Sequence, residues 1–275
     1  MPTQDKSLQC DIPFELDDAL AVALDAVRAG CSVLAEGSTR LERISKTSKS
    51  PGDVSTEIDR LAESAILSRI RAVFPDHAAV GEETGASGES PFRWIVDPLD
   101  GTMNYIRGFP YYAVSVALQA SDTVVLGVVA DPVREEYFTA IRGRGAYCNS
   151  KRIEVSRCQG LGEAMVGTVV PPPRWPGLNG YLDLFCHVAR RAAGVRRAGA
   201  AALDLASVAA GRLDAFFVLS LKTWDIAAGS LLVTEAGGAV ADIDGNPDPL
   251  KTNRLAAAAP EVLPELLAAL RRAAD

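Results

Sequence analysis

Residues 93–104 read RWIVDPLDGTMN, and the rest of the chain is organised around this stretch. Trp94 to Val96 form a short apolar run that contains two β-branched residues, which predicts a buried strand. Pro98 lacks a backbone N–H and cannot continue a hydrogen-bonded ladder. We therefore expect the strand to stop near Asp97, so that a carboxylate closes a buried strand.

A helix is expected to begin directly after this strand. Asp100 is predicted to be its N-cap, with Gly101 and Thr102 in the first turn. Asp97 and Asp100 lie three residues apart, so both carboxylates are placed where the strand ends and the helix begins. Hard cations prefer such oxygen ligands, and the N–H groups at a helix start can hold an anion beside them. The stretch therefore predicts a site that binds cations and an anion together.

The composition is that of an ordinary globular protein, with 48% hydrophobic and 23% charged residues in a chain of 275. This length suits one large domain or two moderate ones that share an interface. The net charge of −7 argues against a general nucleic-acid binder, which would present a basic face. We therefore expect no nucleic-acid partner. A phosphorylated substrate is compatible with this charge, because bound metals can supply positive charge.

The cysteines indicate a reducing compartment. There are five of them, widely spread, and no Cys-x-x-Cys pair occurs, so neither a zinc site nor a disulfide framework is expected. Residues 1–11 are polar and lack the apolar core of a signal peptide. No apolar run is long enough to span a membrane. These observations predict a cytoplasmic protein with no membrane partner.

Two classes of enzyme are excluded by missing residues. The chain has only two histidines, His77 and His187, and neither lies in a nucleophile motif of the Ser-His-Asp or Cys-His type. We expect both to be structural or surface residues. Residues 143–148, GRGAYC, lack the last glycine and the following helix of a dinucleotide-binding motif. An oxidoreductase with such a cofactor is therefore not expected.

The first half of the chain predicts two helices followed by a mostly antiparallel sheet. Helices are expected over residues 15–36 and 53–74, and strands over 78–81, 111–120, 123–130, 136–140 and 152–155. Gly37 is expected to end the first helix and Asp53 to cap the second. Residues 38–52, with Lys49, are expected to form a polar loop that acts as a flap. Ser121-Asp122 is predicted to be a hairpin turn. This order is typical of an α+β fold and not of repeated βαβ units.

A change in composition over residues 156–162 predicts a boundary. We expect residues 1–155 to form an N-terminal α+β half that carries most candidate metal ligands, and residues 156–275 to form an α/β half that completes the site. In this second half, strands are expected over residues 164–170, 213–219, 239–243 and 255–259, and helices over 179–191, 199–210, 225–235 and 261–271. Residues 171–177 are expected to form a proline-rich loop.

Three further acidic residues qualify as metal ligands or partners by context. Glu82 follows a strand, Asp225 begins a helix and Asp59 lies within the second helix. Two or three Mg²⁺ ions need oxygen ligands from several segments. Each of these residues alone has an ordinary alternative, as a cap, a loop charge or a solvated helix residue. Asp97 is different, because a carboxylate that closes an apolar strand is costly unless it is paired or bound to metal.

Several motifs together resemble those of the inositol monophosphatase family. The longest are WIVDPLDGTMNY at residues 94–105, with GFP at 108–110, and WDIAAG at 224–229, with TEAGG at 234–238. GEET at 81–84 and KSPGD at 49–53 occur in the expected order. The two long motifs together are highly specific. The resemblance runs from about residue 15 to the C-terminus.

The resemblance implies a lithium-sensitive, Mg²⁺-dependent phosphomonoesterase with a layered α-β-α-β-α sandwich of the sugar and inositol phosphatase type, usually a homodimer. Matching positions imply that two or three Mg²⁺ ions are held by Glu82, Asp97, the Leu99 carbonyl, Asp100 and Asp225. The phosphate would meet Asp100, Gly101 and Thr102. Thr102 and Asp59 would orient the attacking water, with Glu82 as their metal-linked partner. The loop with Lys49 and Asp53 would close over the metals. Because metal binding lowers the pKa of water, no histidine base is needed.

The small phosphorylated substrate is expected to contact Gly199, Ala200, Ala201, Val218 and Asp225. Val218 stands where inositol-binding members of the family carry a glutamate. An apolar side chain cannot replace carboxylate–diol hydrogen bonds, which argues against tight inositol recognition. At Gly199 simple close packing is an alternative.

Because Val218 argues against tight inositol recognition, other substrates and another class of function are considered. A phosphorylated polyol or sugar is the first expectation, and histidinol phosphate and nucleotide 3′-phosphates are alternatives. A non-catalytic binding protein on the same fold is an alternative from another class.

Overall fold

The computed structural model describes residues 12–43, 45–50, 53–244 and 249–271. In the first half the helices are α1 (Leu16–Ser38), α2 (Glu57–Val73) and the short α3 (Thr102–Ile106). The strands there are β1 (Lys46–Ser50), β2 (Asp53–Thr56), β3 (Ala78–Gly81), β4 (Gly85–Ser87), β5 (Phe92–Asp100), β6 (Ala113–Ala120), β7 (Thr123–Asp131), β8 (Glu136–Ile141), β9 (Gly145–Cys148) and β10 (Lys151–Ile153).

In the second half the helices are α4 (Leu178–Ala189), α5 (Ala201–Ala209), α6 (Thr223–Glu235), α7 (Pro249–Thr252) and α8 (Leu263–Arg271). The strands are β11 (Met165–Thr168), β12 (Gly194–Arg196), β13 (Ala215–Val218), β14 (Ala239–Ala241) and β15 (Leu255–Ala258). Two of these elements were not predicted from the sequence, namely β12 and α7, which have three and four residues. Such short elements carry too little apolar periodicity to be recognised. Among all the residues that the structure describes, no helix is both long and apolar enough to cross a membrane.

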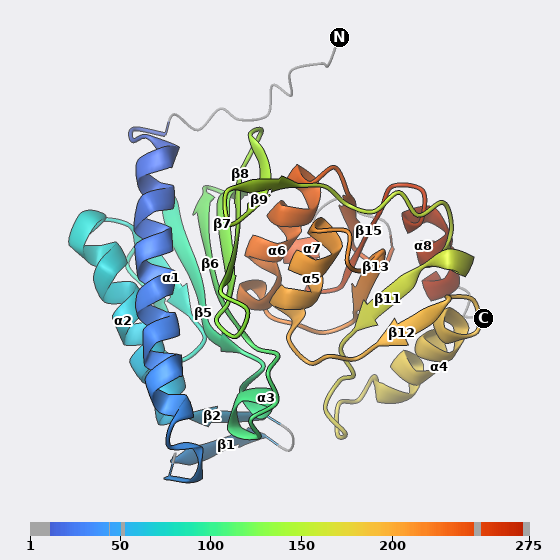
Figure 1. Ribbon diagram of the computed structural model, residues 1–275, viewed down its shortest axis with the longest axis horizontal. Coiled ribbons are helices and arrows are strands. Elements are labelled where there is room, and N and C mark those ends of the chain that lie inside the picture. Colours follow the sequence, from blue (N-terminus) through green and yellow to red (C-terminus); the bar gives the residue numbers. More distant parts are fainter. Residues whose placement is uncertain (1–11, 44, 51–52, 245–248, 272–275) are drawn as a thin grey trace.

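Five layers of secondary structure stack on one another (Figure 1). Helices α1 and α2 cover the outer face of an eight-stranded sheet, and α5 and α6 lie between this sheet and a five-stranded one. Helices α4 and α8 cover the far face of the second sheet. The α-β-α-β-α sandwich that the resemblance implies is therefore confirmed.

The larger sheet has the strand order β10-β9-β8-β7-β6-β5-β3-β4. Neighbouring strands in this sheet pair antiparallel, except that β3 and β5 pair parallel. The predicted hairpin is confirmed: β6 pairs with β7, and Ser121 in the turn adopts a left-handed φ of 52°. The smaller sheet has the order β12-β11-β13-β15-β14 and mixes parallel and antiparallel pairs. The α+β pattern expected for the first half is confirmed.

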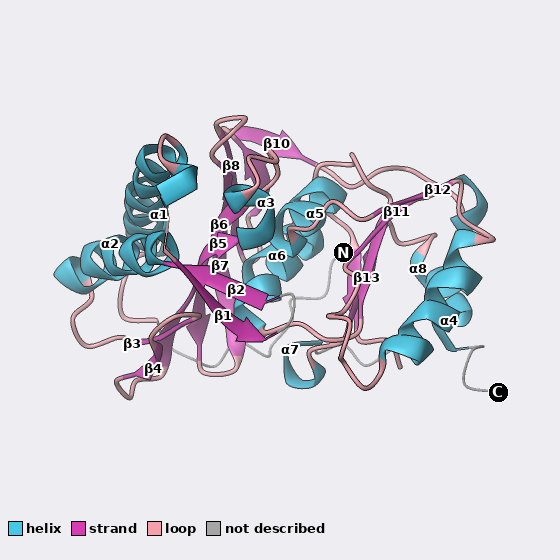
Figure 2. Cartoon of the chain, turned by 90° about the horizontal axis from the view of Figure 1, so that it is seen from below, coloured by secondary structure: helices cyan, strands magenta, loops and turns pink. Residues whose placement is uncertain are grey.

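The segment between α1 and α2 differs from its predicted form. Residues in the predicted polar loop form β1, which pairs antiparallel with β2, and this hairpin lies beside α3 (Figure 2). The Pro51-Gly52 pair between two Ser- and Thr-containing runs is a hairpin signal that the polarity of the segment obscured. Asp53 opens β2 and does not cap α2. The side chains of Lys49 and Asp53 lie outside the described residues, so their role in a closing loop stays a prediction.

Thr56 is the N-cap of α2. Its Oγ1 accepts a hydrogen bond from the Ile58 N–H at 3.1 Å, and Asp59 Oδ2 accepts one from the Thr56 N–H at 2.8 Å. This reciprocal arrangement is a capping box. It also fixes the Asp59 side chain at the buried start of the helix.

Gly37 does not end α1, which continues to Ser38. It belongs to the last turn of the helix and is buried. A Cβ on this residue would lie 2.9 Å from Ile58 Cδ1 and would also collide with the Tyr105 hydroxyl. Tyr105 donates a hydrogen bond from that hydroxyl to the Leu34 carbonyl at 2.7 Å. Gly37 therefore serves close packing between α1, α2 and α3.

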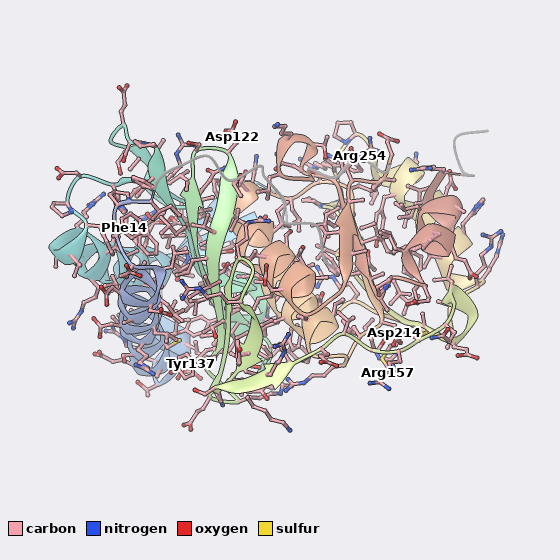
Figure 3. All side chains as sticks on the ribbon, turned by 90° about the horizontal axis from the view of Figure 1, so that it is seen from above. Phe14, Asp122, Tyr137, Arg157, Asp214 and Arg254 are labelled. Atoms are coloured by element: carbon pink, nitrogen blue, oxygen red, sulfur yellow. The ribbon has the colours of Figure 1, made fainter. Side chains whose placement is uncertain are left out.

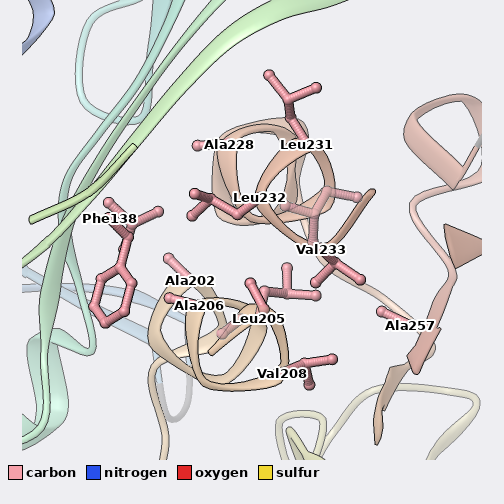
Figure 4. Packing of buried hydrophobic residues seen from close by; sticks show 14 of the residues in the cluster. Phe138, Ala202, Leu205, Ala206, Val208, Ala228, Leu231, Leu232, Val233 and Ala257 are labelled. Atoms are coloured by element: carbon pink, nitrogen blue, oxygen red, sulfur yellow. The ribbon is translucent and has the colours of Figure 1, made fainter. Parts of the chain in front are cut away.

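The two halves of the chain share the middle layer of helices. Figure 4 shows α5 and α6 side by side, with Phe138 of the larger sheet on one side and Ala257 of the smaller sheet on the other. Alanines such as Ala202 and Ala206 keep the two helices thin enough to fit between the sheets. The division into residues 1–155 and 156–275 stays a prediction.

Asp214 holds the connecting segment against the smaller sheet (Figure 3). Its Oδ1 accepts a hydrogen bond from Ser156 Oγ and its Oδ2 one from the Met165 N–H, both at 2.6 Å. One carboxylate thus joins the segment after β10 to the start of β11.

Gly127 of β7 allows α6 to approach the larger sheet. A Cβ at this position would lie 2.9 Å from Ala228 Cα and 3.0 Å from the Ala228 carbonyl oxygen. Backbone atoms cannot rotate away, so we expect Gly127→Ala to lower the free energy of unfolding by about 1–3 kcal/mol. Urea denaturation measures this. Gly180→Ala is the control, because nothing lies within 4 Å of its Cβ. Gly180→Ala should keep or raise stability, because alanine suits a helix better than glycine. A Gly127→Ala variant as stable as the wild type would contradict the prediction.

His77 belongs to an aromatic cluster, as expected for a structural residue. Its ring stacks on Phe74 with centroids 4.6 Å apart, and its Nδ1 accepts a hydrogen bond from Trp94 Nε1 at 3.1 Å. Burial lowers the pKa of His77, against a weaker opposing effect of Asp76. The folded state therefore holds this proton less tightly than the unfolded state does.

The protein is therefore expected to lose stability as the pH falls through the ordinary histidine range, near 6.5. Urea unfolding at a series of pH values measures the effect. In His77→Phe, which keeps a stacked ring but cannot bind a proton, this part of the pH dependence should vanish. An unchanged pH profile in that variant would refute the assignment.

Candidate metal centre

Three aspartates from two layers meet at the end of β5 and the start of α6. Asp97, Asp100 and Asp225 each offer a carboxylate oxygen, and these oxygens lie within 4.8 Å of one another. Asp97 is fully buried, while Asp100 and Asp225 are half-buried. The structure thus brings together the two motif aspartates and one residue from the second half of the chain.

The strand that carries the motif does not stop at Asp97 and continues to Asp100. Its register against β6 shifts between these two residues: Asp97 faces Ser115 and Asp100 faces Ala113. Pro98 falls within this irregularity, where its missing N–H does not interrupt the ladder. The irregularity therefore explains why the proline does not end the strand.

Asp100 does not cap the helix that follows it. Gly101 is the N-cap of α3, with a left-handed φ of 93° that favours glycine. Asp100 Oδ2 instead accepts a hydrogen bond from the Ala202 N–H at 2.7 Å. Ala202 lies in the first turn of α5, so this carboxylate caps a helix from the other half of the chain.

Asp225 is the third residue of α6, whose N-cap is Lys222. Its Oδ2 accepts a hydrogen bond from the Lys222 N–H at 2.6 Å. It therefore helps to cap the helix without being the N-cap itself, while its carboxylate takes part in the cluster.

Glu82 follows β3, and its N–H donates to the Val96 carbonyl at 3.2 Å. Its charge is close enough to raise the pKa of both Asp97 and Asp225. The structure thus places Glu82 beside the three aspartates, and its role as a metal ligand stays a prediction.

The cluster is electrostatically costly. Burial raises the pKa of Asp97 well above its usual range, and the neighbouring charges of Glu82, Asp100 and Asp225 add to this. Burial likewise raises the pKa of Asp225 to about 7. Asp97 Oδ2 is buried and accepts no hydrogen bond from the described residues. Crowded oxygen ligands with an unpaired buried oxygen fit a hard divalent cation.

Thr102 connects the cluster to α2. Its Oγ1 lies 3.0 Å from Asp59 Oδ1 and 3.1 Å from the Leu99 carbonyl oxygen. Burial raises the pKa of Asp59, against the opposing hydrogen bonds from Thr56 and Thr102. The structure thus joins Asp59 and Thr102 by a hydrogen bond, and their predicted role in orienting water stays a prediction.

The turn predicted to contact the substrate, at residues 199–201, lies against the motif at residues 94–105. Gly199 has a left-handed φ of 96°, and Ala200 and Ala201 are buried. Asn104 Nδ2 donates to the Ala198 carbonyl at 2.9 Å, which joins this turn to α3. Val218 is 1% exposed and belongs to the core. Close packing is therefore present, and the substrate contacts stay predictions.

Two residues that sequence reasoning missed hold this site together, namely Asn104 and Glu63. Glu63 is completely buried, and its carboxylate accepts hydrogen bonds from the Glu83 and Thr84 N–H groups. The available signal was its position four residues after Asp59, on the same face of α2. Asn104 had no comparable signal outside the family motif.

The fold and this centre define a class: a layered α+β protein with a carboxylate cluster suited to hard divalent cations. The family model for the inositol monophosphatase family matches residues 15–275. The chain belongs to the inositol monophosphatase family.

Relatives of known structure or name agree with this membership. "Nus factor SuhB" from Pseudomonas aeruginosa is 45% identical over 244 residues, covering 86% of this chain and 90% of that protein. The solved structure of extragenic suppressor protein suhB from Bartonella henselae has a TM-score of 0.90 at 36% identity and covers 93% of this chain and 99% of that one. Inositol monophosphatase from Anabaena has a TM-score of 0.81 at 32% identity, with coverages of 94% and 96%.

The names of these relatives fall into two groups. Some are called inositol monophosphatase and others Nus factor SuhB. The comparisons therefore give no support to the expectation that nucleic acid is not a partner of this chain.

Proposed function

We propose that this protein hydrolyses a small phosphomonoester, an inositol monophosphate-like polyol or a sugar phosphate, with the help of Mg²⁺. The observation that carries the proposal is the convergence of Asp97, Asp100 and Asp225 around a buried, unpaired carboxylate oxygen. Two or three Mg²⁺ ions would be held by these residues together with Glu82 and the Leu99 carbonyl. Bound Mg²⁺ would supply Lewis acidity and lower the pKa of the attacking water.

Thr102 and Asp59 would orient that water. The Thr102 hydroxyl has one proton to donate, and it lies at hydrogen-bonding distance from two acceptors. When the proton points at Asp59, the Leu99 carbonyl is left for a metal, and the Thr102 oxygen can accept a hydrogen bond from water. Thr56 holds the second oxygen of Asp59, so the acceptor cannot swing away.

The phosphate would lie against Asp100, Gly101 and Thr102. The first N–H groups of α3 have no partner within the helix, and they are the donors proposed here. α3 has only five residues, so its macrodipole contributes little to anion binding. Glycine at residue 101 lets the turn at Gly199 pack against this start of α3, because a Cβ there would lie 3.1 Å from the Tyr111 carbonyl oxygen and 3.2 Å from that of Gly199.

Further parts of the proposal come from the family resemblance and from the composition. They are lithium sensitivity, assembly as a homodimer, a cytoplasmic location, and substrate contacts from Asp225, Val218 and the turn at Gly199. Histidinol phosphate and nucleotide 3′-phosphates are alternative substrates at the same site.

A second candidate function is a non-catalytic binding role. The observation in its favour is that the relative with 45% identity carries the name Nus factor SuhB and not that of a phosphatase. The geometry of the carboxylate cluster favours catalysis, because a binding surface has no need of a costly buried acidic centre.

Phosphate release by the purified protein distinguishes the two functions. We expect Mg²⁺-dependent release from at least one member of a panel containing myo-inositol 1-phosphate, a sugar phosphate, histidinol phosphate and a nucleotide 3′-phosphate, ranked by kcat/KM. No release from any of them, by a protein that binds Mg²⁺, would favour the binding role. A wide preference for myo-inositol 1-phosphate would show that the argument from Val218 is wrong.

A further inference from the structure

Helix α2 directs two buried carboxylates toward the metal centre. Asp59 and Glu63 lie four residues apart, which places them on one face of the helix. Asp59 reaches Thr102, as described above. Glu63 reaches the turn after β3, which carries Glu82 in its first position.

Both oxygens of Glu63 are used in this contact. Oε2 accepts a hydrogen bond from the Glu83 N–H at 2.8 Å, and Oε1 accepts one from the Thr84 N–H at 2.9 Å. Glu63 is 0% exposed. A buried carboxylate is costly unless it is hydrogen-bonded, and an apolar side chain would fill the inner face of α2 at lower cost. Its presence therefore points to a role in holding the turn.

Gly81 makes the contact close. A Cβ on this residue would lie 2.6 Å from Glu63 Oε1, a distance that no real side chain tolerates. The carboxylate therefore lies directly beneath the end of β3. On the other side, the Glu82 N–H is held by the Val96 carbonyl, so the backbone around Glu82 is fixed from α2 and from β5.

We propose that Glu63 is a positioning residue for the metal centre: it fixes the turn at Glu82–Thr84 so that the Glu82 carboxylate stays beside Asp97 and Asp225. The inference rests on the metal-dependent function proposed above. It requires that both oxygens of residue 63 accept hydrogen bonds. Glutamine offers one acceptor and one NH₂ donor, and that donor would face a backbone N–H.

Glu63→Gln is therefore expected to weaken Mg²⁺ binding about 10–100-fold, the range found when a group that orients a metal ligand is lost. Isothermal titration calorimetry with Mg²⁺ measures this without any substrate. At saturating Mg²⁺, kcat should recover to within a few-fold of wild type, because the ligands themselves are intact. Glu57→Gln is the matched control, since it removes an exposed carboxylate from the same helix.

The turn should remain folded in Glu63→Gln. Glu83 has a second anchor, because its Oε2 accepts a hydrogen bond from Ser55 Oγ at 2.8 Å. Amide hydrogen exchange in the metal-free protein tests the positioning itself. The Glu83 and Thr84 amides should exchange faster in Glu63→Gln than in the wild type, and their exchange rates should not change in Glu57→Gln.

Gly81→Ala provides an independent second variant, because its new methyl group would displace the Glu63 carboxylate while leaving the charge in place. If both variants act through the same contact, their effects on Mg²⁺ affinity will not add in the double variant. Additive effects, or wild-type Mg²⁺ affinity in Glu63→Gln, would overturn the inference and leave the proposed function standing. A wild-type protein that binds no Mg²⁺ would overturn both.

Discussion

Asp97→Asn is expected to reduce Mg²⁺-dependent phosphate release at least about 10³-fold, because the loss of a charged metal ligand forfeits several kcal/mol of charge stabilisation. Asp97 is the most deeply buried member of the cluster, and its Oδ2 has no hydrogen-bond partner among the described residues. Asparagine keeps the size of the side chain and the acceptor for the Leu99 N–H, which lies 3.0 Å from Asp97 Oδ1. The loss should therefore come from the charge and not from a rearranged strand.

The same substitution is expected to stabilise the metal-free protein. Burial and the charges of Glu82, Asp100 and Asp225 disfavour an ionised Asp97. Asparagine removes this penalty. For a chain of this size, each kcal/mol gained would raise Tm by about 2–4 °C. Excess Mg²⁺ should reverse the order, because it stabilises only the protein whose ligands are intact.

The advantage of Asp97→Asn should depend on pH in a defined direction. Carboxyl groups with a raised pKa bind protons more tightly in the folded state than in the unfolded state, so their contribution to stability is complete below pH 3.8 and is lost as the pH rises. With Asp225 titrating near pH 7 in the folded state, the metal-free wild-type protein should weaken between these two pH values. The variant should weaken less.

Thermal unfolding and phosphate release, with and without Mg²⁺, check these expectations. Asp122→Asn is the matched control, because Asp122 is exposed in the β6–β7 turn (Figure 3), at the other end of β6 from Ser115, the strand partner of Asp97. It should change neither measurement. Activity of Asp97→Asn within tenfold of wild type would show that Asp97 is not a metal ligand.

Thr102→Val is expected to lower kcat by about 10²–10⁴-fold, the usual contribution of a group that handles the transferred proton. Valine has nearly the shape of threonine but lacks the hydroxyl, so it can neither accept a hydrogen bond from water nor donate one to Asp59 Oδ1. Mg²⁺ affinity should stay within a few-fold of wild type, because the metal ligands are untouched.

A comparison with Thr102→Ser isolates the hydroxyl. Serine keeps that group and should retain most of the activity, while its missing methyl group accounts for any change in packing. Steady-state kinetics at saturating Mg²⁺, together with calorimetric Mg²⁺ titrations, provide both quantities. If Thr102→Val and Thr102→Ser had the same kcat, the hydroxyl would have no part in orienting water.

Most of the fold could be predicted from the sequence. Apolar periodicity indicated α1 and α2, and the Ser121-Asp122 turn between two strands indicated the antiparallel hairpin. Two of the errors share one cause. Gly37 and Asp100 each occur at a place where local rules predict a cap, and each has a different role because a segment distant in the sequence packs against it. Asp53 instead opens a strand that pairs with the segment just before it.

The candidate site shows the same limit. Asp97, Glu82, Asp225 and the pairing of Asp59 with Thr102 could be predicted, because the motifs name them. Glu63 was missed, since a glutamate on a helix ordinarily lies in solvent and its spacing from Asp59 does not by itself indicate burial. Only the docking of α2 under β3 buries it and gives its oxygens two backbone N–H partners.

The stretch at residues 93–104 thus determined by itself the chemistry of the centre: two carboxylates, a carbonyl and a glycine turn within a few residues. Local sequence is sufficient for this, because ligand type and short spacing are properties of neighbouring residues. The tertiary structure alone decided which groups those carboxylates meet. Asp100 caps α5, whose Ala202 lies 102 residues away, because that helix is held between two sheets. Contacts at such a distance depend on how the layers pack, and no local pattern specifies them.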